Sequence, residues 1–294
     1  MGTMFDVVVY HESRGEAERA IAGALAEIGR IDRVLSHFDP QSELSALVGR
    51  ARRGATAVSP DLYDVIARSL EFSRLSAGKF DVTVAPLVQA HRRARDEGRP
   101  LSEAETRAAQ ACVGYEKIEL AGHGRIAFHS SCLDIDLGGI GKGYAVDRAL
   151  RVLRAAGIDH AVVNAGGSSI GAAGKPPGGD GWPVQLGDAE RPGRIVSLRD
   201  GSVSTSQPSA GGIGDIVDPQ SARLAHGLTV SVFAPSATAS DALATTLLML
   251  PVPDSRRLLA RFEEVSALWL TPSGTVAASF REPLTMMPWV ASAP

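Results

Sequence analysis

The sequence is poor in cysteine, in long apolar runs and in charge of one sign. Its 294 residues contain only two cysteines, Cys112 and Cys132. Two are too few for a disulfide framework or a structural zinc site, so we expect both sulfurs to be buried packing atoms. No apolar run reaches the roughly 18 residues that a membrane-spanning helix needs. The 30 basic and 33 acidic side chains nearly cancel, which argues against nucleic acid as a partner.

The start of the chain carries no recognisable targeting signal. Residues 1–16 (MGTMFDVVVYHESRGE) lack the basic, apolar and small-residue regions of a signal peptide. We therefore expect a cytoplasmic protein, or an exported one whose leader has been removed. The length is near the upper limit for one hydrophobic core. We expect a single domain over residues 1–294, or two packed subdomains within it.

The spacing of apolar residues predicts a mixture of helices and strands. Ser59 followed by Pro60 is typical of a helix start, and Ser102 with Glu105 is typical of a capping box. The predicted helices cover residues 15–36, 62–70, 141–156, 240–250 and 254–262, with another after Ser102. The predicted strands cover residues 5–10, 117–120, 126–129, 133–137, 161–164, 184–186, 195–198, 228–233, 267–270 and 276–280. This order lacks a strict βαβ rhythm and favours an α+β fold, with layered mixed sheets and covering helices.

A glycine cluster precedes one of these helices. Residues 136–147 (DLGGIGKGYAVD) run from a predicted strand into glycines that open a helix, where free backbone N–H groups favour an anion. The spacing fits neither the dinucleotide fingerprint GxGxxG nor the Walker A loop. The cluster is therefore either a phosphate-binding loop, in which the bound anion offsets the unfavourable position of Lys142 near a helix start, or a tight turn that needs glycine for packing.

A carboxylate and a hydroxyl lie one helical turn apart near residue 240. The spacing of Asp241 and Thr245 places both on one helix face. Two such oxygens are a partial shell for Mg²⁺, which keeps several waters and binds substrate phosphates. The alternative is local: Asp is common in a first helical turn, and Thr often bonds back to a carbonyl.

Taken together, several short segments resemble motifs of the ApbE family of flavin transferases in the same order along the chain. They are residues 1–3 (MGT), 36–45 (SHFDPQSELS), 78–87 (GKFDVTVAPL), 136–147, 164–167 (NAGG), 204–206 (STS) and 241–245 (DALAT). One such segment is weak support, but an ordered set is specific. The resemblance implies an ApbE-like, T-fold-like globular unit. It also implies transfer of FMN from FAD to a Thr or Ser of an acceptor protein, with Mg²⁺ and release of AMP.

The resemblance also implies a set of ligand-binding residues. Mg²⁺ would be held by Asp241, Thr245 and the Gly139 carbonyl. FAD would be held by Met1, Phe38, Lys79, Phe80, Asp81, Asp136, Lys142 and Ile216. Without the resemblance, Phe38 and Phe80 would be read as core aromatics and Asp81 as a turn or cap residue.

The sequence departs from the family at one motif. Where family members carry a His-[IL]-x-D-P-x-T-G stretch, residues 215–222 read DIVDPQSA, which places Asp215 at the histidine position. A carboxylate cannot donate to a phosphate as an imidazolium can. Asp215 and Asp218 are candidates for the general base by position alone. The sequence thus leaves two hypotheses: an FMN transferase, or an FAD-binding protein or FAD pyrophosphatase of the same fold.

Overall fold

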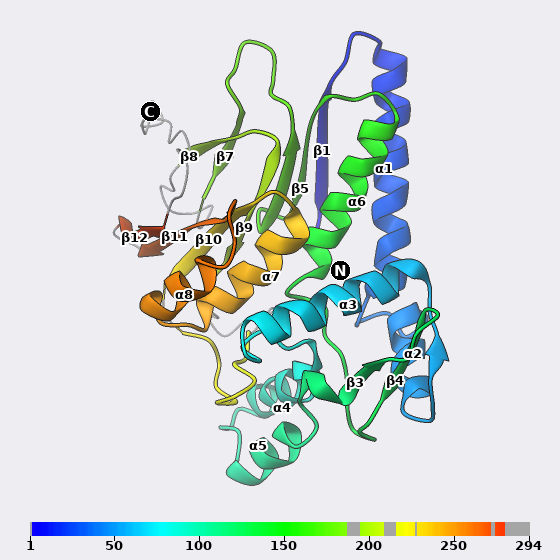
Figure 1. The fold of residues 1–294 in the computed structure, drawn as a ribbon, viewed down its shortest axis with the longest axis vertical. Helices are drawn as coiled ribbons and strands as arrows, with labels where there is room; N and C mark the ends of the chain where they lie inside the picture. Colours follow the sequence, from blue (N-terminus) through cyan, green and yellow to red (C-terminus); the bar gives the residue numbers. More distant parts are fainter. Residues whose placement is uncertain (1, 187–194, 209–215, 227, 272–273, 280–294) are drawn as a thin grey trace. The chain divides into compact units, whose positions relative to one another are not determined.

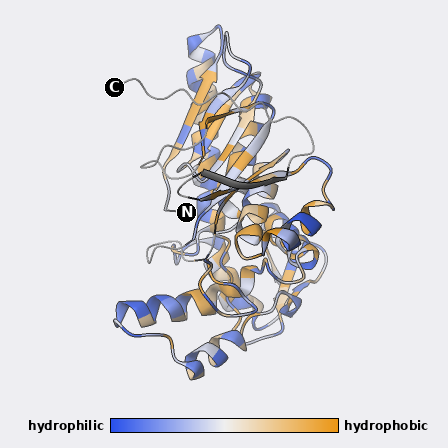
Figure 2. Ribbon diagram, turned by 90° about the vertical axis from the view of Figure 1, so that its left-hand side faces the viewer, coloured by the Kyte–Doolittle hydropathy of each residue, from blue (hydrophilic) through white to orange (hydrophobic). Residues whose placement is uncertain are grey.

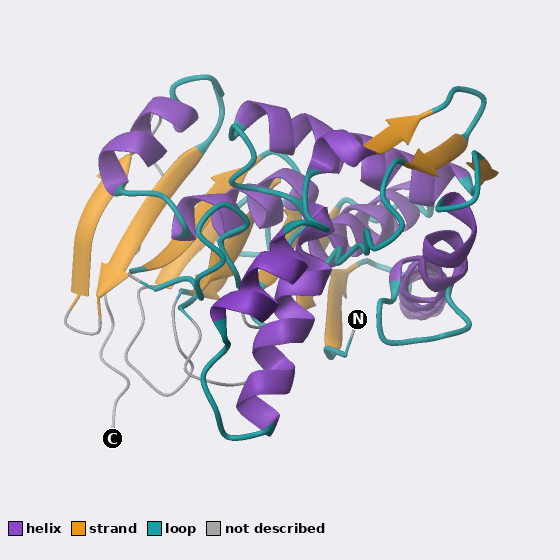
Figure 3. Cartoon of the chain, turned by 90° about the horizontal axis from the view of Figure 1, so that it is seen from below, coloured by secondary structure: helices purple, strands orange, loops and turns teal. Residues whose placement is uncertain are grey.

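The computed structural model describes residues 2–186, 195–208, 216–226, 228–271 and 274–279 of the chain (Figure 1). It divides into two compact units. Unit 1 contains Met1 and residues 30–141 and 208–227, and unit 2 contains residues 2–29, 142–207 and 228–294. Both mix helices with strands (Figure 3), which confirms the predicted α+β class.

Unit 1 combines short helices with a small antiparallel sheet. Its sheet has the order β2-β4-β3. The predicted caps are present, since Ser59 accepts from the Leu62 N–H and Ser102 forms a full capping box with Glu105. The elements are α2 (Glu43–Ala51), β2 (Thr56–Ala57), α3 (Pro60–Leu75), the 3₁₀ turn η1 (Val82–Val84), α4 (Ala85–Asp96), α5 (Glu103–Gln110), η2 (Tyr115–Lys117), β3 (Ile118–Leu120) and β4 (Arg125–Phe128).

One predicted strand of unit 1 is wrong. Residues 133–137 form no regular element and pair with no strand among the described residues. Other parts of the unit bind their backbone instead. Arg52 donates to the Leu133 carbonyl with Nε at 3.0 Å and Nη2 at 2.5 Å, and a His37 ring nitrogen lies 3.0 Å from the Ile135 carbonyl. The Asp136 N–H donates to the Val82 carbonyl at 2.8 Å.

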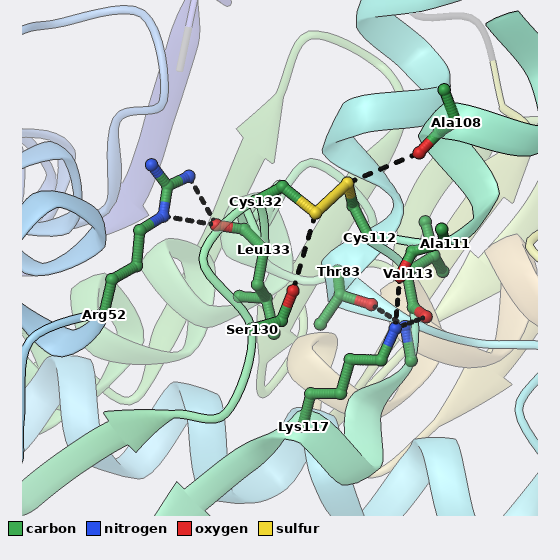
Figure 4. Close-up of a disulfide and its surroundings, with 11 residues drawn as sticks. Arg52, Thr83, Ala108, Ala111, Cys112, Val113, Lys117, Ser130, Cys132 and Leu133 are labelled. Atoms are coloured by element: carbon green, nitrogen blue, oxygen red, sulfur yellow. Dashed lines mark hydrogen bonds between the residues drawn. A yellow bond between two sulfur atoms is a disulfide. The ribbon is translucent and has the colours of Figure 1, made fainter.

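The expectation that both cysteines are buried packing atoms is confirmed for the burial of Cys112 and is wrong for Cys132. Cys112 and Cys132 form a disulfide within unit 1 (Figure 4), and Cys132 is exposed rather than buried. The bridge joins Cys112, two residues after the end of α5, to Cys132, directly before the segment 133–137. Lys117 Nζ donates at 2.7 Å to the carbonyls of Ala111 and Val113, on either side of Cys112. The sequence could not show this pairing, because nothing in the spacing of two cysteines shows that the fold brings them together.

Unit 2 is built on a seven-stranded antiparallel sheet with the order β1-β5-β6-β9-β10-β11-β12. A separate ribbon pairs β7 with β8. Its strands are β1 (Phe5–Tyr10), β5 (His160–Ala165), β6 (Ser169–Ala173), β7 (Trp182–Gln185), β8 (Ile195–Leu198), β9 (Gly201–Ser206), β10 (Thr229–Ala234), β11 (Ser266–Thr271) and β12 (Gly274–Ser279). Its helices are α6 (Gly141–Ala155), α7 (Ala237–Leu248), α8 (Val252–Leu259) and most of α1 (Arg14–Leu35).

The two faces of the large sheet bury different layers. On one face, α1 and α6 run side by side and pack on β5 through residues such as Ala24, Leu153 and Val163 (Figure 1). The opposite face packs on the β7–β8 ribbon through residues such as Val184 and Phe233. Because both faces are covered, strands β6 and β10 are buried along almost their whole length, and Figure 2 shows apolar and polar residues along the elements of the structure. Among the described residues, no helix is long and apolar enough to cross a membrane.

We expect the disulfide to stabilise unit 1. Closing a loop between cysteines 20 residues apart restricts the unfolded chain, which corresponds to a loss of about 3 kcal/mol when the bridge is removed. Reduction with dithiothreitol should therefore lower the free energy of unfolding measured in urea by about that amount. The Cys112→Ser/Cys132→Ser double variant should show the lower stability with or without reductant. Two free thiols in the unreduced, denatured protein would contradict the bridge.

Candidate functional site

Helices α6 and α7 cap each other's first turns. Asp147 of α6 accepts from the N–H groups of Ala237 and Thr238 at 2.8 and 2.9 Å, and from the Thr238 hydroxyl. In return, Asp241 of α7 accepts from the Gly143 N–H at 2.9 Å. Each carboxylate thus satisfies backbone donors that a helix start leaves unpaired and lies at the positive end of the partner's dipole. This arrangement fixes the position of Asp241 relative to the start of α6.

The close approach of α6 and α7 requires glycine at 143. A Cβ at Gly143 would overlap the Ala237 carbonyl and lie 2.8 Å from the Asp241 Cβ. Below the helices, the sheet presents small residues. A Cβ at Gly171 of β6 would lie 2.7 Å from Val146 of α6, and the Ser204 hydroxyl of β9 contacts that of Ser240 at 2.8 Å. Gly143, the last glycine of the cluster, is therefore needed for packing, which agrees for this position with one of the two hypotheses drawn from the sequence.

The predicted metal and phosphate residues of unit 2 meet at this helix pair. Asp241 is only 4% exposed, and Lys142 Nζ lies 3.9 Å from its Oδ1. Because the Gly143 N–H occupies Oδ2, the oxygen that faces Lys142 is the one available to a cation. Thr245 follows one turn later on α7 and is half-buried. Among the described residues, no group of three His, Cys, Asp or Glu side chains forms a metal site.

In unit 1, Lys79 is paired with Asp218. Lys79 Nζ lies 2.7 Å from Asp218 Oδ2, and the carboxylate also accepts from Ser221 Oγ and the Gln220 N–H. Burial raises the pKa of Asp218, but these three donors outweigh that effect and hold the pKa below its usual range. A carboxylate with a lowered pKa is a weak base. The geometry therefore suits Asp218 to holding Lys79 better than to taking a proton.

Asp218 belongs to a small hairpin formed by residues 216–225. A bridge pairs Val217 with Leu224, and side chains of other elements bind the loop. Gln110 donates to the Gln220 carbonyl, and a His91 ring nitrogen contacts the Ala222 carbonyl at 2.7 Å. Ala222 has a φ of +56°, a conformation that favours glycine. It occupies the position of the glycine in the His-[IL]-x-D-P-x-T-G motif, to which residues 215–222 correspond. An alanine there costs about 1 kcal/mol relative to glycine.

The two phenylalanines predicted to contact FAD differ in their surroundings. Phe38 is 61% exposed, and the Arg92 guanidinium lies 5.7 Å above the centre of its ring. It therefore offers an aromatic face to a flat ligand. The Phe80 ring is buried and packs edge-on against Phe72 at 6.2 Å. Phe80 could reach a ligand through its backbone, since its ring is part of the core.

Both predicted acidic FAD residues of unit 1 are bound to nearby backbone. Asp81 accepts from the N–H and hydroxyl of Thr83 and from the Tyr115 N–H. Burial raises the pKa of Asp81, although these hydrogen bonds act in the opposite direction. Asp136 accepts from the Gly138 N–H at 2.7 Å. These bonds help to fix the backbone of two segments that carry predicted ligand-binding residues, residues 79–81 and residues 136–139. Gly139 belongs to the second segment.

The remaining predicted site residues divide into two groups. Ile216 is half-buried at the start of the hairpin, where its carbonyl accepts from the Ala225 N–H. Met1 and Asp215 lie outside the described residues. Their predicted contacts with FAD and with the transferred proton therefore stay predictions, as do the ligand roles of the other residues.

Comparison with known proteins then decides the family. A model of the ApbE family matches residues 1–269. This chain belongs to the ApbE family. The chain is 30% identical to an FAD:protein FMN transferase of Treponema pallidum, over 95% of this chain and 84% of the relative, and 26% identical to one of Klebsiella pneumoniae, over 93% and 83%.

Solved ApbE structures have the same fold. A mutant of the flavin transferase ApbE from Vibrio cholerae superposes with a TM-score of 0.81 at 25% identity, covering 95% of this chain and 94% of that one. The ApbE protein from Thermotoga maritima gives a TM-score of 0.79 at 25% identity, covering 94% and 96%. The family and fold that the ordered motifs predicted are thus confirmed.

Sequence reasoning missed several residues around this ApbE site. Asp147 was noted only as the end of a motif, although an Asp six residues into a helix is unfavourable unless its side chain has a partner. Arg92 has no sequence signal that would link it to Phe38. The partner of Lys79 was missed for the same reason, because the two residues of that pair lie 139 positions apart.

We expect Asp147→Asn to destabilise the chain by about 1–3 kcal/mol, because one backbone N–H at the start of α7 would then face an amide donor. The measurement is the free energy of unfolding in urea. Asp254→Asn is the matched control, since the Asp254 side chain is 45% exposed beside Arg257 and its loss should change stability by less than about 0.5 kcal/mol. Equal stabilities for the two variants would contradict the capping role of Asp147.

Proposed function

We propose that this chain is an FAD:protein FMN transferase that uses Mg²⁺. The observation that carries the proposal is the buried Asp241 beside Lys142 at the start of α6, in a chain of the ApbE family. The names of its relatives support FAD as donor and a protein as acceptor. Mg²⁺ is the cation that the resemblance implies, and the oxygen donors of Asp241 and Thr245 support it.

In the proposed reaction, a Thr or Ser hydroxyl oxygen of the acceptor attacks the phosphorus of the FMN half of FAD. The bond from that phosphorus to the bridging oxygen breaks, and AMP leaves with the electron pair. The hydroxyl proton passes to a base. Asp215 and Asp218 remain the candidates for that base, with Asp218 disfavoured by its pairing to Lys79.

The residues of unit 2 fit a hard cation. Asp241 Oδ1 and the Thr245 hydroxyl are oxygen donors one turn apart, and Mg²⁺ takes one or two protein oxygens together with substrate phosphates. Bound there, Mg²⁺ would neutralise charge on the diphosphate. The Gly143 N–H keeps Asp241 oriented by occupying its other oxygen. We also propose that the Gly139 carbonyl, three residues before Lys142, is a third ligand.

Other residues would bind and orient FAD. Lys142 carries a positive charge next to the helix start, where phosphate groups are favoured. The exposed Phe38 ring would stack on a flat ring of FAD, with Arg92 stabilising the ring from its other side. Lys79, held by Asp218, would supply a second fixed charge.

A second candidate rests on Asp215. With a carboxylate at the histidine position, the same fold could bind FAD without transferring FMN, or could let water attack the phosphorus and release FMN and AMP. The disulfide bears on location, since disulfides persist in oxidising compartments and are rare in the cytosol. We therefore propose export over the cytoplasmic location that the sequence favoured.

The test is a single incubation read in two ways. The purified protein is mixed with FAD, MgCl₂ and a peptide that carries one acceptor threonine, and both AMP and peptide-bound flavin are measured. We expect equal amounts of the two, and neither with the Thr→Ala peptide. Asp241→Asn should lower the rate at least about 100-fold, the cost of losing an electrostatic group that acts in the transition state.

Each alternative gives a different result. AMP without flavinylated peptide would identify an FAD pyrophosphatase. Bound FAD with no AMP in any reaction would identify a binding protein and contradict the transferase. Full activity of Asp241→Asn with unchanged Mg²⁺ dependence would remove the metal assignment while leaving the transferase intact.

A further inference from the structure

Lys142 and the proposed metal would compete for the same oxygen. In this structure Lys142 Nζ lies 3.9 Å from Asp241 Oδ1, while Oδ2 accepts from the Gly143 N–H. Asp241 is almost completely buried, and a buried carboxylate is costly unless positive charge lies beside it. In this structure, Lys142 and the start of α6 lie beside Asp241 and supply that charge.

A divalent cation bound at Asp241 Oδ1 would change which positive charge lies beside this carboxylate. Mg²⁺ alone would lie next to the Lys142 ammonium, and the two positive charges would repel one another at close range in a partly buried site. A diphosphate removes this repulsion, because its oxygens can accept hydrogen bonds from the Lys142 ammonium and coordinate the metal at the same time. The side chain is 23% exposed, and its four-carbon stem allows the ammonium to move.

We propose that Lys142 acts as a placeholder for the metal charge in the ligand-free protein and moves to the diphosphate of FAD when Mg²⁺ binds Asp241. This inference rests on the proposed function and adds a coupling to it. Mg²⁺ binds weakly to the free protein, and FAD and Mg²⁺ strengthen each other's binding. By linkage, the factor by which each strengthens the other is the same.

If the binding of FAD and Mg²⁺ is coupled in this way, Lys142→Met should change the affinities for Mg²⁺ and for FAD in opposite directions. Without FAD, Mg²⁺ should bind this variant more tightly than the wild type, because the competing ammonium is gone. With Mg²⁺ present, FAD should bind it more weakly, because a phosphate partner is gone. A residue that served only as an FAD ligand would produce the second effect without the first.

The experiment measures binding rather than turnover. Titration calorimetry gives the affinity of Mg²⁺ alone for the wild type, Lys142→Met and Lys142→Gln. Flavin fluorescence gives the affinity of FAD with and without Mg²⁺, with intact FAD verified by chromatography. We expect Mg²⁺ alone to bind both variants about 3- to 10-fold more tightly than it binds the wild type. We also expect Mg²⁺ to strengthen FAD binding by about 3-fold or less in the variants, compared with about 10-fold or more in the wild type. Both changes lie within the usual range of coupling between two sites.

Two controls define the outcome. Lys142→Arg keeps the charge and should keep weak Mg²⁺ binding in the absence of FAD. Circular dichroism melting tests whether each variant is folded, and the conclusion is drawn from the glutamine variant if the methionine variant is not. Unchanged Mg²⁺ affinity in a folded variant that binds FAD poorly would overturn the placeholder while leaving the proposed function standing. A wild type that binds neither FAD nor Mg²⁺ would overturn both.

Discussion

The exchange of caps between α6 and α7 is the interaction on which the functional geometry of unit 2 depends. Asp147 binds the first N–H groups of α7, and Asp241 binds the Gly143 N–H in the first turn of α6. All three bonds join a charged carboxylate to a backbone donor, which makes them stronger than neutral hydrogen bonds. The two carboxylates thereby fix two helices and aim Asp241 Oδ1 at Lys142.

The sheet beneath these helices is adapted to their close contact. Gly171, Ser202 and Ser204 face the helices, and the two serines contact the Ser240 hydroxyl. Larger side chains at these positions would push the helices away from the sheet and from each other. The small residues of β6 and β9 therefore contribute to the position of Asp241 as much as its own helix does. The geometry of the site thus depends on residues well beyond those that would touch FAD.

Local chemistry determined how much of the fold could be predicted. The helices capped by Ser59 and Ser102 were found because their caps are local signals, and the strands predicted at 117–120 and 126–129 correspond to β3 and β4. Strands β6 and β9 were missed, since their glycine, alanine and serine residues give little apolar alternation. The segment 133–137 was mistaken for a strand, because side chains rather than a neighbouring strand bind its backbone.

In the site, too, local motifs could be predicted from the sequence and long-range contacts could not. Ordered motifs found Lys142, Asp241 and Lys79, but the contacts of these residues are long-range: Gly143 and Asp241 lie 98 positions apart. The disulfide was missed because a pair of cysteines has no sequence pattern that distinguishes a bridge from two thiols. Asp147 was overlooked because its partners, backbone N–H groups of another helix, leave no trace in the residue types around it.

The most direct measurement is a diffraction experiment on crystals of the protein with FAD and Mn²⁺ in place of Mg²⁺, recorded at the manganese absorption edge. The account predicts an anomalous peak within bonding distance of Asp241 Oδ1 and the Thr245 hydroxyl, with the bond from Gly143 to Oδ2 retained. A peak away from both oxygens, or FAD bound with no peak, would contradict it.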